Sequence, residues 1–423
     1  NALLKMRAEA EYNLKHKYLD GKASVDVEHL DLHALGIAPK PLKRSFAFNL
    51  TAEAGRDRAF THLTAGDLKL NFNAHTDVYS LIDQSTGFAK VLIKQLENKA
   101  LDHTELREAL PSAVLSLTAG KENPLSYYLS SSNISYQNVS LKFGTAPDWG
   151  INGKAMVHAL KMDTLQLDTV FFSATQDTTM MKLHGGVING PQNPQLAFSA
   201  SLRGEIRDKD AEVSVEYKNM QGDTGILLGV NARPLTEGGG KGNGIVFTLT
   251  PQDPIIAFRK FHFKENNNWI YLHKNMRLYA NVDMLDDEGM GFRVHSVEGD
   301  TVSLQNMDME ARGIRLEEIS SVLPYFPEIS GLFSAEAHYV QTEKSFQLSA
   351  EASVDELMYE RKRVGDVTVG ATWLPGEQGK QYLNAYLNHE DVEVMVADGK
   401  LMQTRSGTDS LEINTTLEHF PLY

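Results

Sequence analysis

Two short segments of the chain contain residue types that bind metal ions or phosphate. His29 and His33 have the four-residue spacing of two zinc ligands, but the Glu and the helical pattern of a zinc hydrolase motif are missing. Residues 238–244 are glycine-rich around Lys241, as in a phosphate-binding loop. No Ser or Thr follows this lysine, and Ile245 opens an alternating strand pattern instead of a helix. These segments therefore predict loops and no binding site.

Acidic residues gather around Asp283 and residues 286–289, and carboxylate oxygens are ligands that calcium prefers. The alternating ligand positions of a calcium loop are absent, so the segment predicts a tight turn between Val282 and Phe292. The chain has no cysteine, which excludes catalytic thiols, thiolate metal sites and disulfides. It also has no Gly-x-Ser-x-Gly motif. We expect no catalytic residue, no metal site and no cofactor, and therefore no enzyme.

The elements that would position any functional residue are β-strands with one apolar and one polar face. Apolar and polar residues alternate through residues 331–420 in strand-length runs, and the same alternation occurs at 4–14, 46–50 and 68–74. A period of two places successive side chains on opposite faces of a sheet. We therefore predict a mainly β protein with a long sheet that is apolar on one face.

The period changes from two to about 3.6 within residues 77–132, where apolar residues recur at three- and four-residue spacing. This spacing predicts one helix near the start of the block. A second helix is expected from Thr104 to about Leu110, and Val114 and Leu117 are interpreted as its continuation after a proline break.

A third helix is expected to begin with Asn123 as its N-cap and Pro124 at the first helical position. Together the three helices are interpreted as a peripheral insertion, residues 77–132, in a β-rich chain. The sequence thus predicts a sheet segment at 1–76, the helical insertion, and a segment at 133–423 that continues the same sheet.

Composition limits the classes of partner and compartment. The formal net charge is −14, from 55 acidic and 41 basic residues, which argues against a surface that neutralises nucleic-acid phosphates. No apolar run reaches the roughly 18 residues that a membrane-spanning helix needs. The chain begins at Asn1 without an initiator methionine or a signal-type apolar segment. We expect a soluble piece of a longer protein whose anchor lies outside this sequence.

Several segments together resemble a known family. They are residues 254–259 (PIIAFR), 268–277 (NWIYLHKNMR), 322–339 (VLPYFPEISGLFSAEAHY), 365–375 (GDVTVGATWLP) and 382–387 (YLNAYL). The sequence of these segments is similar to the middle part of TamB-type translocation and assembly module proteins, which belong to the AsmA-like group. The similarity covers about the second half of the chain, and residues 30–50 more loosely.

The resemblance implies a fold and a function. Proteins of this group are anchored in the inner membrane of Gram-negative cells and cross the periplasm. Their elongated antiparallel sheet curls into an open trough, a β-taco that is apolar inside and carries phospholipids towards the outer membrane, and so supports outer-membrane biogenesis. Some members work with an Omp85-type outer-membrane barrel. By resemblance we expect such a trough here, interrupted by the helical block, in the periplasm, with phospholipids as partners and no nucleic acid.

The expected lipid groove is the apolar face of the alternating strands. Its predicted residues are Phe46, Phe48, Leu50, Leu68, Leu70, Phe72, Phe333, Ala335, Ala337, Tyr339, Phe346, Leu348, Ala350, Val354, Val367, Val369, Ala371, Trp373, Val392, Val394, Val396, Leu411, Ile413 and Leu417.

The alternation of apolar and polar residues also allows other interpretations. Periodicity alone favours a stack of β-sandwich domains for adhesion or glycan binding, since most half-buried sheets pack on another sheet. The same family resemblance also fits a factor that assembles outer-membrane proteins without moving lipid. A right-handed β-helix polysaccharide lyase is disfavoured because no convergent acidic or basic cluster is readable.

Overall fold

The structure is a computed structural model of the 423-residue chain. It describes residues 4–13, 18–30, 33, 46–97, 101–235, 244–300, 302–322, 326–343, 345–376, 380–403 and 409–418. Strands account for 67% of the chain, which confirms the prediction of a mainly β protein. The chain divides into two compact units, unit 1 (Asn1–Gly222) and unit 2 (Asp223–Tyr423).

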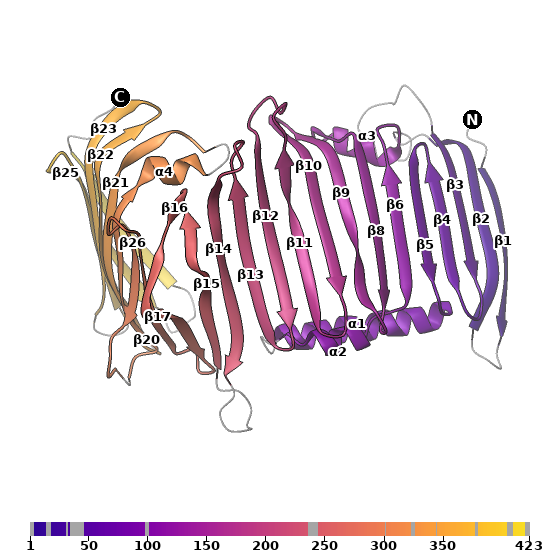
Figure 1. Ribbon diagram of the computed structural model, residues 1–423, viewed down its shortest axis with the longest axis horizontal. Helices are drawn as coiled ribbons and strands as arrows, with labels where there is room; N and C mark the ends of the chain where they lie inside the picture. Colours follow the sequence, from indigo (N-terminus) through magenta and orange to yellow (C-terminus); the bar gives the residue numbers. More distant parts are fainter. Residues whose placement is uncertain are drawn as a thin grey trace. The chain divides into compact units, whose positions relative to one another are not determined.

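Unit 1 is built on an antiparallel sheet whose strands follow each other in chain order (Figure 1). The strands are β1 (Leu4–Asn13), β2 (Tyr18–Leu30), β3 (Phe46–Ala54), β4 (Ala59–Ala65), β5 (Leu68–Ala74), β6 (Ala113–Ala119), β7 (Ile134–Ser135), β8 (Asn138–Ala146), β9 (Gly150–Met162), β10 (Leu165–Gln176), β11 (Met180–Asn189), β12 (Phe198–Arg207) and β13 (Asp210–Lys218). Each strand pairs with the next, except that β6 pairs with β8 and the short β7 pairs with β9. Antiparallel neighbours need only short turns, so each hairpin widens the sheet by about 4.8 Å.

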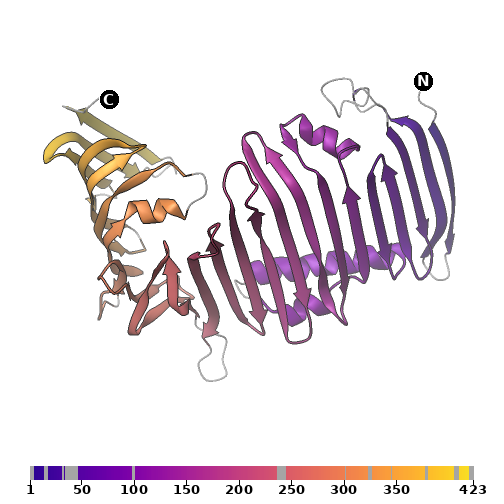
Figure 2. The ribbon, with the colours of Figure 1, turned by 45° about the horizontal axis from the view of Figure 1, so that its top comes forward.

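Three helices belong to unit 1: α1 (Val78–Glu97), α2 (His103–Glu108) and α3 (Pro124–Ser130). α1 runs across the sheet at one end of the strands, and α3 lies at the opposite end of the strands (Figures 1 and 2). The ring of Tyr79 in α1 makes an edge-to-face contact with Tyr12 of β1, with centroids 5.8 Å apart. At the other end of α1, the side-chain amide of Gln95 donates to the Asp102 carbonyl at 3.2 Å and to Glu105 at 2.9 Å. These contacts fix α1 at both of its ends.

Residues 113–119 are a strand, so the prediction of a helical block through 77–132 is wrong there. β6 pairs with β5 on one side and with β8 on the other. Val114 and Leu117, expected on one helix face, point to opposite faces of the sheet, and Leu117 lies opposite Leu70. Without β6, β5 and β8 would each present an edge of unpaired backbone groups. Residues 113–119 are thus part of the sheet and do not belong to a peripheral insertion.

The expected start of the third helix is confirmed. Asn123 is the N-cap of α3, Pro124 is its first residue, and the Asn123 side chain accepts a hydrogen bond from the Ser126 amide at 2.9 Å. α2 begins similarly, because the Asp102 carboxylate accepts from the backbone N–H of Thr104 at 3.0 Å. In both cases a side chain satisfies a backbone donor that the first turn leaves without a helical partner.

In unit 2 the strands again form an antiparallel sheet in chain order (Figure 1). They are β14 (Thr224–Leu235), β15 (Gly244–Ile256), β16 (Arg259–Lys260), β17 (His262–His273), β18 (Leu278–Leu285), β19 (Gly291–Ser296), β20 (Gln305–Arg315), β21 (Ile329–Gln341), β22 (Phe346–Tyr359), β23 (Lys362–Pro375), β24 (Lys380–His389), β25 (Val392–Gln403) and β26 (Asp409–Leu417). β15 pairs with β14 and β17, the two-residue β16 pairs only with β15, and from β17 onward each strand pairs with the next. One short helix, α4 (Leu316–Ser321), follows β20.

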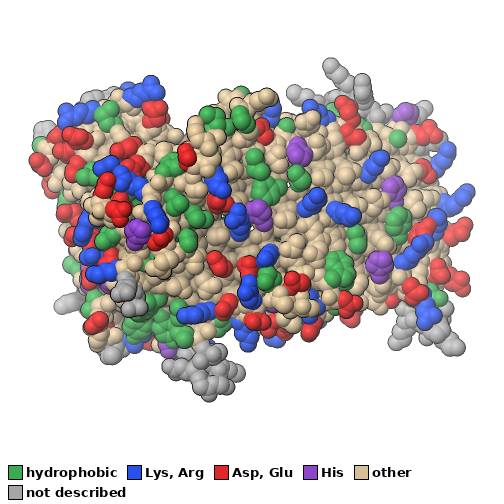
Figure 3. Space-filling model, in the orientation of Figure 1, with side chains coloured by type: hydrophobic (Ala, Val, Ile, Leu, Met, Phe, Trp, Pro, Cys, Tyr) green, Lys and Arg blue, Asp and Glu red, His purple; other side chains and the backbone are tan. Residues whose placement is uncertain are grey.

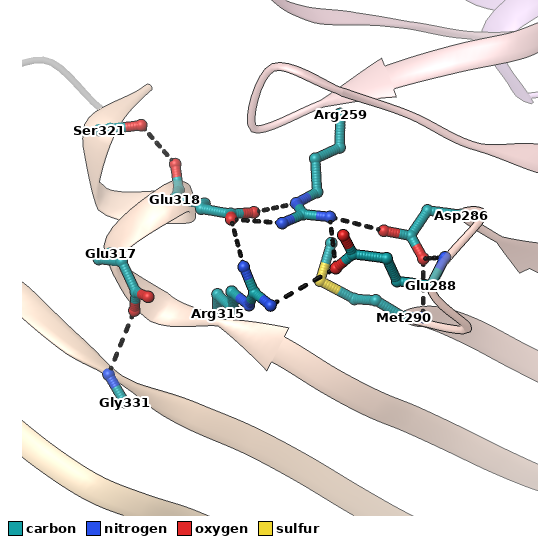
Figure 4. A network of polar contacts seen from close by, with 9 residues as sticks. All are labelled: Arg259, Asp286, Glu288, Met290, Arg315, Glu317, Glu318, Ser321 and Gly331. Atoms are coloured by element: carbon teal, nitrogen blue, oxygen red, sulfur yellow. Dashed lines mark hydrogen bonds and ion pairs between the residues drawn. The ribbon is translucent and has the colours of Figure 1, made fainter.

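A compact core covers part of the apolar face of unit 2. It consists of Phe261, Phe263, Val282, Met284, Met290 and Ile314. Ile319 of α4 packs against this cluster. An ion-pair network holds the segments over the core (Figure 4). The Arg259 guanidinium donates to Glu318 of α4 at 2.8 Å and to Asp286 at 3.0 Å. The bond to Glu318 raises the pKa of Arg259, so this residue stays charged.

The acidic segment between β18 and β19 is a tight turn, as predicted. One Asp286 carboxylate oxygen accepts from the backbone N–H groups of Glu288 and Met290, each at 2.9 Å. Gly289 has a φ of +87°, a conformation that glycine adopts without strain. Of the glycine-rich segment, residues 238–243 lie outside the described part, while β15 begins at Gly244 and contains the alternation predicted to follow.

Candidate functional site

One face of unit 1 carries a row of apolar positions that crosses the whole sheet. Residues directly opposite each other on antiparallel strands share a face, so the strand register identifies the row. Its members are Met6, Val25, Leu50, Leu63, Leu70, Leu117, Leu141, Ala155, Phe172, Gly185, Leu202 and Val215. The row takes one residue from each of twelve strands and contains no polar side chain.

A parallel row runs on each side of this central row, two residues away along every strand. One comprises Leu4, Val27, Phe48, Ala65, Leu68, Ala119, Val139, Val157, Val170, Val187, Ala200 and Tyr217. The other comprises Ala8, Ala23, Ala52, Thr61, Phe72, Leu115, Phe143, Gly153, Ala174, Leu183, Gly204 and Val213. We call these three rows the apolar strip. Thr61 and the phenol of Tyr217 are its only polar groups.

The apolar strip has the dimensions of a lipid path. Twelve strands about 4.8 Å apart give a length of about 53 Å along the sheet. Three rows, each two residues of about 3.3 Å from the next, give a width of about 13 Å. Half of a hydrocarbon core of about 30 Å, the depth that one acyl chain covers, is about 15 Å. The length of an acyl chain laid along the strands is therefore close to the width of the strip.

The apolar strip is open to solvent within the described part of unit 1. Met6 is 71% exposed and Leu202 is 53% exposed, and the other large side chains of the strip are mostly half-buried. All described strands of unit 1 belong to the one sheet, and no described second sheet packs on this face. Exposed apolar areas above a few hundred Å² are rare in soluble monomers and usually mark an interaction surface.

The opposite face of unit 1 is polar. Lys142 and Lys154 lie directly opposite each other on it. His62 shares a 2.6 Å hydrogen bond with Asn71 across β4 and β5. The face of unit 1 turned to the viewer in Figure 3 carries scattered basic, acidic and histidine side chains, as expected for this polar side. The sheet therefore has the one-sided character that the alternation predicted.

α1 borders the strip at one end of the strands. In β1 to β6 the next row on this side consists of small residues, Ala10, Gly21, Ala54, Ala59, Ala74 and Ala113. Small side chains let a helix lie close to a sheet, and Ala74 is fully buried. α1 also has an exposed apolar stripe of its own, formed by Tyr79, Ile82, Ile93 and Leu96 at helical spacing. α1 thus adds apolar surface beside the strip.

α3 borders the strip at the other end of the strands. The ring of Tyr127 in α3 packs against Phe46 of β3, with centroids 5.2 Å apart. Gly66, with a φ of +62°, makes the turn after β4. A Cβ at Gly66 would come within 2.0 Å of the Glu122 carbonyl, so only glycine allows the segment before α3 to approach this turn.

The structure places the groove residues predicted in the first part of the chain on this face. Phe48, Leu50, Leu68, Leu70 and Phe72 are members of the strip. Phe46 lies at its border with α3. The strip residues of β1, β2, β4, β6 and β8 to β13 were not predicted. Their alternation is readable, as in Leu141 and Phe143, but only the strand register shows that they share a face with β3 to β5.

The groove residues predicted for unit 2 mostly share one face of its sheet as well. Register places Phe333, Ala335, Ala337, Tyr339, Phe346, Leu348, Ala350, Val354, Val367, Val369, Ala371, Trp373, Val392, Leu411, Ile413 and Leu417 together. Val396 is an exception, because it lies opposite Tyr386 on the polar face. A bulge in β25 contains the buried Val394 and shifts the alternation, so that Met395 takes the apolar position beside Leu387.

The polar face of unit 2 has a hollow of about 920 Å³. Glu310, Glu336 and Glu351 lie side by side across three strands in its lining. Arg293 pairs with Glu310 at 3.2 Å, and the Tyr386 hydroxyl donates to Glu351, which raises the pKa of this tyrosine. No group of three or more His, Asp or Glu among the described residues is arranged to hold a metal ion. In unit 2, therefore, a charged hollow lies opposite the apolar face.

Comparison of the chain with family models, curated proteins and solved structures gives no match. The likeness to TamB-type proteins therefore remains a prediction from the quoted segments. Among the described helices, none has both the length and the apolar character of a membrane span.

Proposed function

We propose that this chain is part of a TamB-type envelope protein of the AsmA-like group and carries phospholipid along the apolar face of its sheet. The observation that supports the proposal is the apolar strip, which continues through twelve strands of unit 1. The proposed setting is the periplasm, between an inner-membrane anchor and an Omp85-type partner in the outer membrane. The proposed trough forms by curling of the sheet with the strip inside.

The free energy of lipid transfer explains why a continuous strip is useful. A phospholipid with about thirty acyl methylenes, at about 0.8 kcal/mol each, faces a barrier on the order of 20 kcal/mol in water. A surface that covers one side of the chains at every step lowers this barrier along the whole path. Such a surface needs no specific pocket, which fits a face with almost no polar side chain. The proposal includes no catalytic step.

The strand arrangement favours this function over two alternatives. A β-sandwich for adhesion buries its apolar faces against a second sheet, whereas the described strands of unit 1 join one sheet. A β-helix lyase is built from parallel strands, whereas the described pairings are antiparallel. A factor that guides unfolded outer-membrane proteins over the same strip is an alternative that the experiment below separates from lipid transport.

Site-specific photo-crosslinking tests the proposal in cells that make the full-length protein. A crosslinking residue is placed at Leu70 and at Leu348, and control residues come from the same strands but the opposite face, Lys69 and Ser349. We expect phospholipid adducts at the two leucine positions and none at the controls. Crosslinks to protein alone at both leucine positions would reject lipid transport. Adducts with outer-membrane proteins in place of lipid would assign the strip to protein assembly.

A further inference from the structure

A small cavity lies where the apolar strip ends against α3. Its volume is about 390 Å³, within the range of sites that hold small ligands. The lining contains two cations, several hydroxyls and an amide, supplied by Lys121, Ser126, Tyr127, Ser135, Gln137 and Lys161. We call it the rim cavity.

The rim cavity is on the same face as the apolar strip. Tyr127 of α3 lines the cavity and packs against Phe46 at the border of the strip, and Lys161, in the same lining, lies four residues beyond the strip residue Val157 in β9. Ser135 lies directly opposite Lys161 in the β7–β9 pairing. Lys121 lies two residues beyond Ala119, the last strip residue of β6. The two lysines therefore lie beyond the end of the strip, two residues past its last member in β6 and four residues past its last member in β9.

Both lysines are available to bind an anion. Lys121 and Lys161 are exposed, and neither takes part in an ion pair within the described residues. The hydroxyls beside them are held by local bonds, since Ser126 donates to the Gly120 carbonyl at 2.8 Å. The hydroxyl of Tyr127 donates to the Glu122 carboxylate at 3.5 Å. The Glu122 carboxylate is not part of the cavity lining.

We propose that the rim cavity binds the phosphate of a phospholipid whose acyl chains lie on the apolar strip. This inference rests on the proposed function. Ammonium groups form charge-assisted hydrogen bonds to phosphate oxygens, and the adjacent strip accepts the chains. The cavity thus orients the lipid, with its headgroup at the α3 end of the strands and its chains along them.

The test uses purified protein and short-chain phosphatidylglycerol, with diacylglycerol of the same chain length as a ligand without phosphate. The double variant Lys121→Gln, Lys161→Gln removes both charges and keeps polar side chains. We expect its affinity for phosphatidylglycerol to fall about tenfold or more, with a weaker salt dependence, while its affinity for diacylglycerol stays unchanged. An equal affinity of the wild type and the double variant for phosphatidylglycerol would overturn the inference.

The matched control is the double variant Lys142→Gln, Lys154→Gln, which changes two exposed lysines of β8 and β9 on the opposite face. It is expected to bind both lipids as the wild type does, and a loss equal to that of the rim variant would overturn the inference. Titration with inorganic phosphate distinguishes a failure of this inference from a failure of the proposed lipid transport. If the protein bound inorganic phosphate through Lys121 and Lys161 but bound neither lipid, the rim cavity would be an anion site only. Phospholipid binding at the cavity and the proposed function would then both be rejected.

Discussion

The buried side chain of Asn123 joins two turns of unit 1 by donating a 2.7 Å hydrogen bond to Asp67, 56 residues earlier in the chain. The same Asp67 carboxylate accepts from the backbone N–H groups of Gly120 at 3.2 Å and Glu122 at 3.0 Å. Asn123 is also the N-cap of α3. One amide therefore fixes the β4–β5 turn, the segment after β6 and the start of the helix that borders the strip.

Asn123→Ala is expected to lower the free energy of unfolding by about 2 kcal/mol. The change removes a helix cap, which contributes about 1 kcal/mol, and leaves buried partners of the amide without their hydrogen bonds. Chemical denaturation measures the loss. Asn138→Ala is the control, because Asn138 is exposed at the start of β8, and we expect it to change the free energy by less than about 0.5 kcal/mol. Equal losses for the two variants would contradict the role of Asn123.

Arg259→Ala is expected to destabilise unit 2 by about 2 kcal/mol. Asp286, whose side chain is 4% exposed, and Glu318 would lose the cation that compensates their charge, and an unpaired buried carboxylate is unfavourable. The unfolding midpoint measures the effect. Arg361→Ala is the control, since its ion pair with Glu328 is exposed, and it should leave the midpoint nearly unchanged. A midpoint for Arg259→Ala at the wild-type value would show that the network does not hold α4.

The turn between β10 and β11 is expected to lose stability in acid. The Thr179 hydroxyl, then the backbone N–H groups of Thr179 and Met180, donate to Asp177 and lower its pKa from 3.8 to about 2. A pKa that is lower in the folded state stabilises the fold above the unfolded value, and this stabilisation is lost as the pH falls from about 5 through 2. Asp177→Asn keeps an acceptor oxygen and removes the titration.

Acid unfolding of this variant is therefore expected to be less steep between pH 4 and pH 2 than that of the wild type. Denaturation midpoints at a series of pH values measure the difference. Asp208→Asn, in the turn between β12 and β13, is the control and should follow the wild-type profile. A wild-type pH profile for Asp177→Asn would contradict the assignment.

Much of the fold follows from local pattern. Alternation predicted most of the strands because apolar and polar residues alternate with a period of two in a strand whose sheet has one face in water and one face away from it. The start of α3 was predicted because Asn123 and Pro124 act on the backbone next to them. The turn at residues 286–289 was predicted for the same reason. These features depend on neighbours in sequence.

Features that depend on distant partners were not predicted. β6 is a strand because β5 and β8 both need its backbone groups, and Val114 and Leu117 alone suit a helix or a strand. Val396 lies on the polar face because β25 contains a bulge, and the position of this bulge depends on the pairing with β24. Lys121 and Lys161 are 40 positions apart, and only the pairing of β6, β8 and β9 brings them into one cavity.

Leu117→Asp is expected to block lipid passage along unit 1. Leu117 lies in the central row of the strip, between Leu70 and Leu141. A carboxylate there stays solvated when the strip is empty, but a passing acyl chain must displace its water, at a cost of several kcal/mol. This cost corresponds to a decrease in lipid occupancy of about a hundredfold. Lipid adducts at a crosslinker placed at Leu70 measure the occupancy.

Ser116→Asp is the control for this variant, because it introduces the same charge one residue away on the polar face of β6. It should leave the adducts at Leu70 unchanged, and circular dichroism should show wild-type strand content for both variants. The two variants carry the same charge on the same strand at nearly the same position along the sheet. A difference between them is therefore due to the face on which the carboxylate lies. If Leu117→Asp leaves lipid adducts at wild-type levels in a folded protein, lipid does not follow the central row, and the strip is covered by something else.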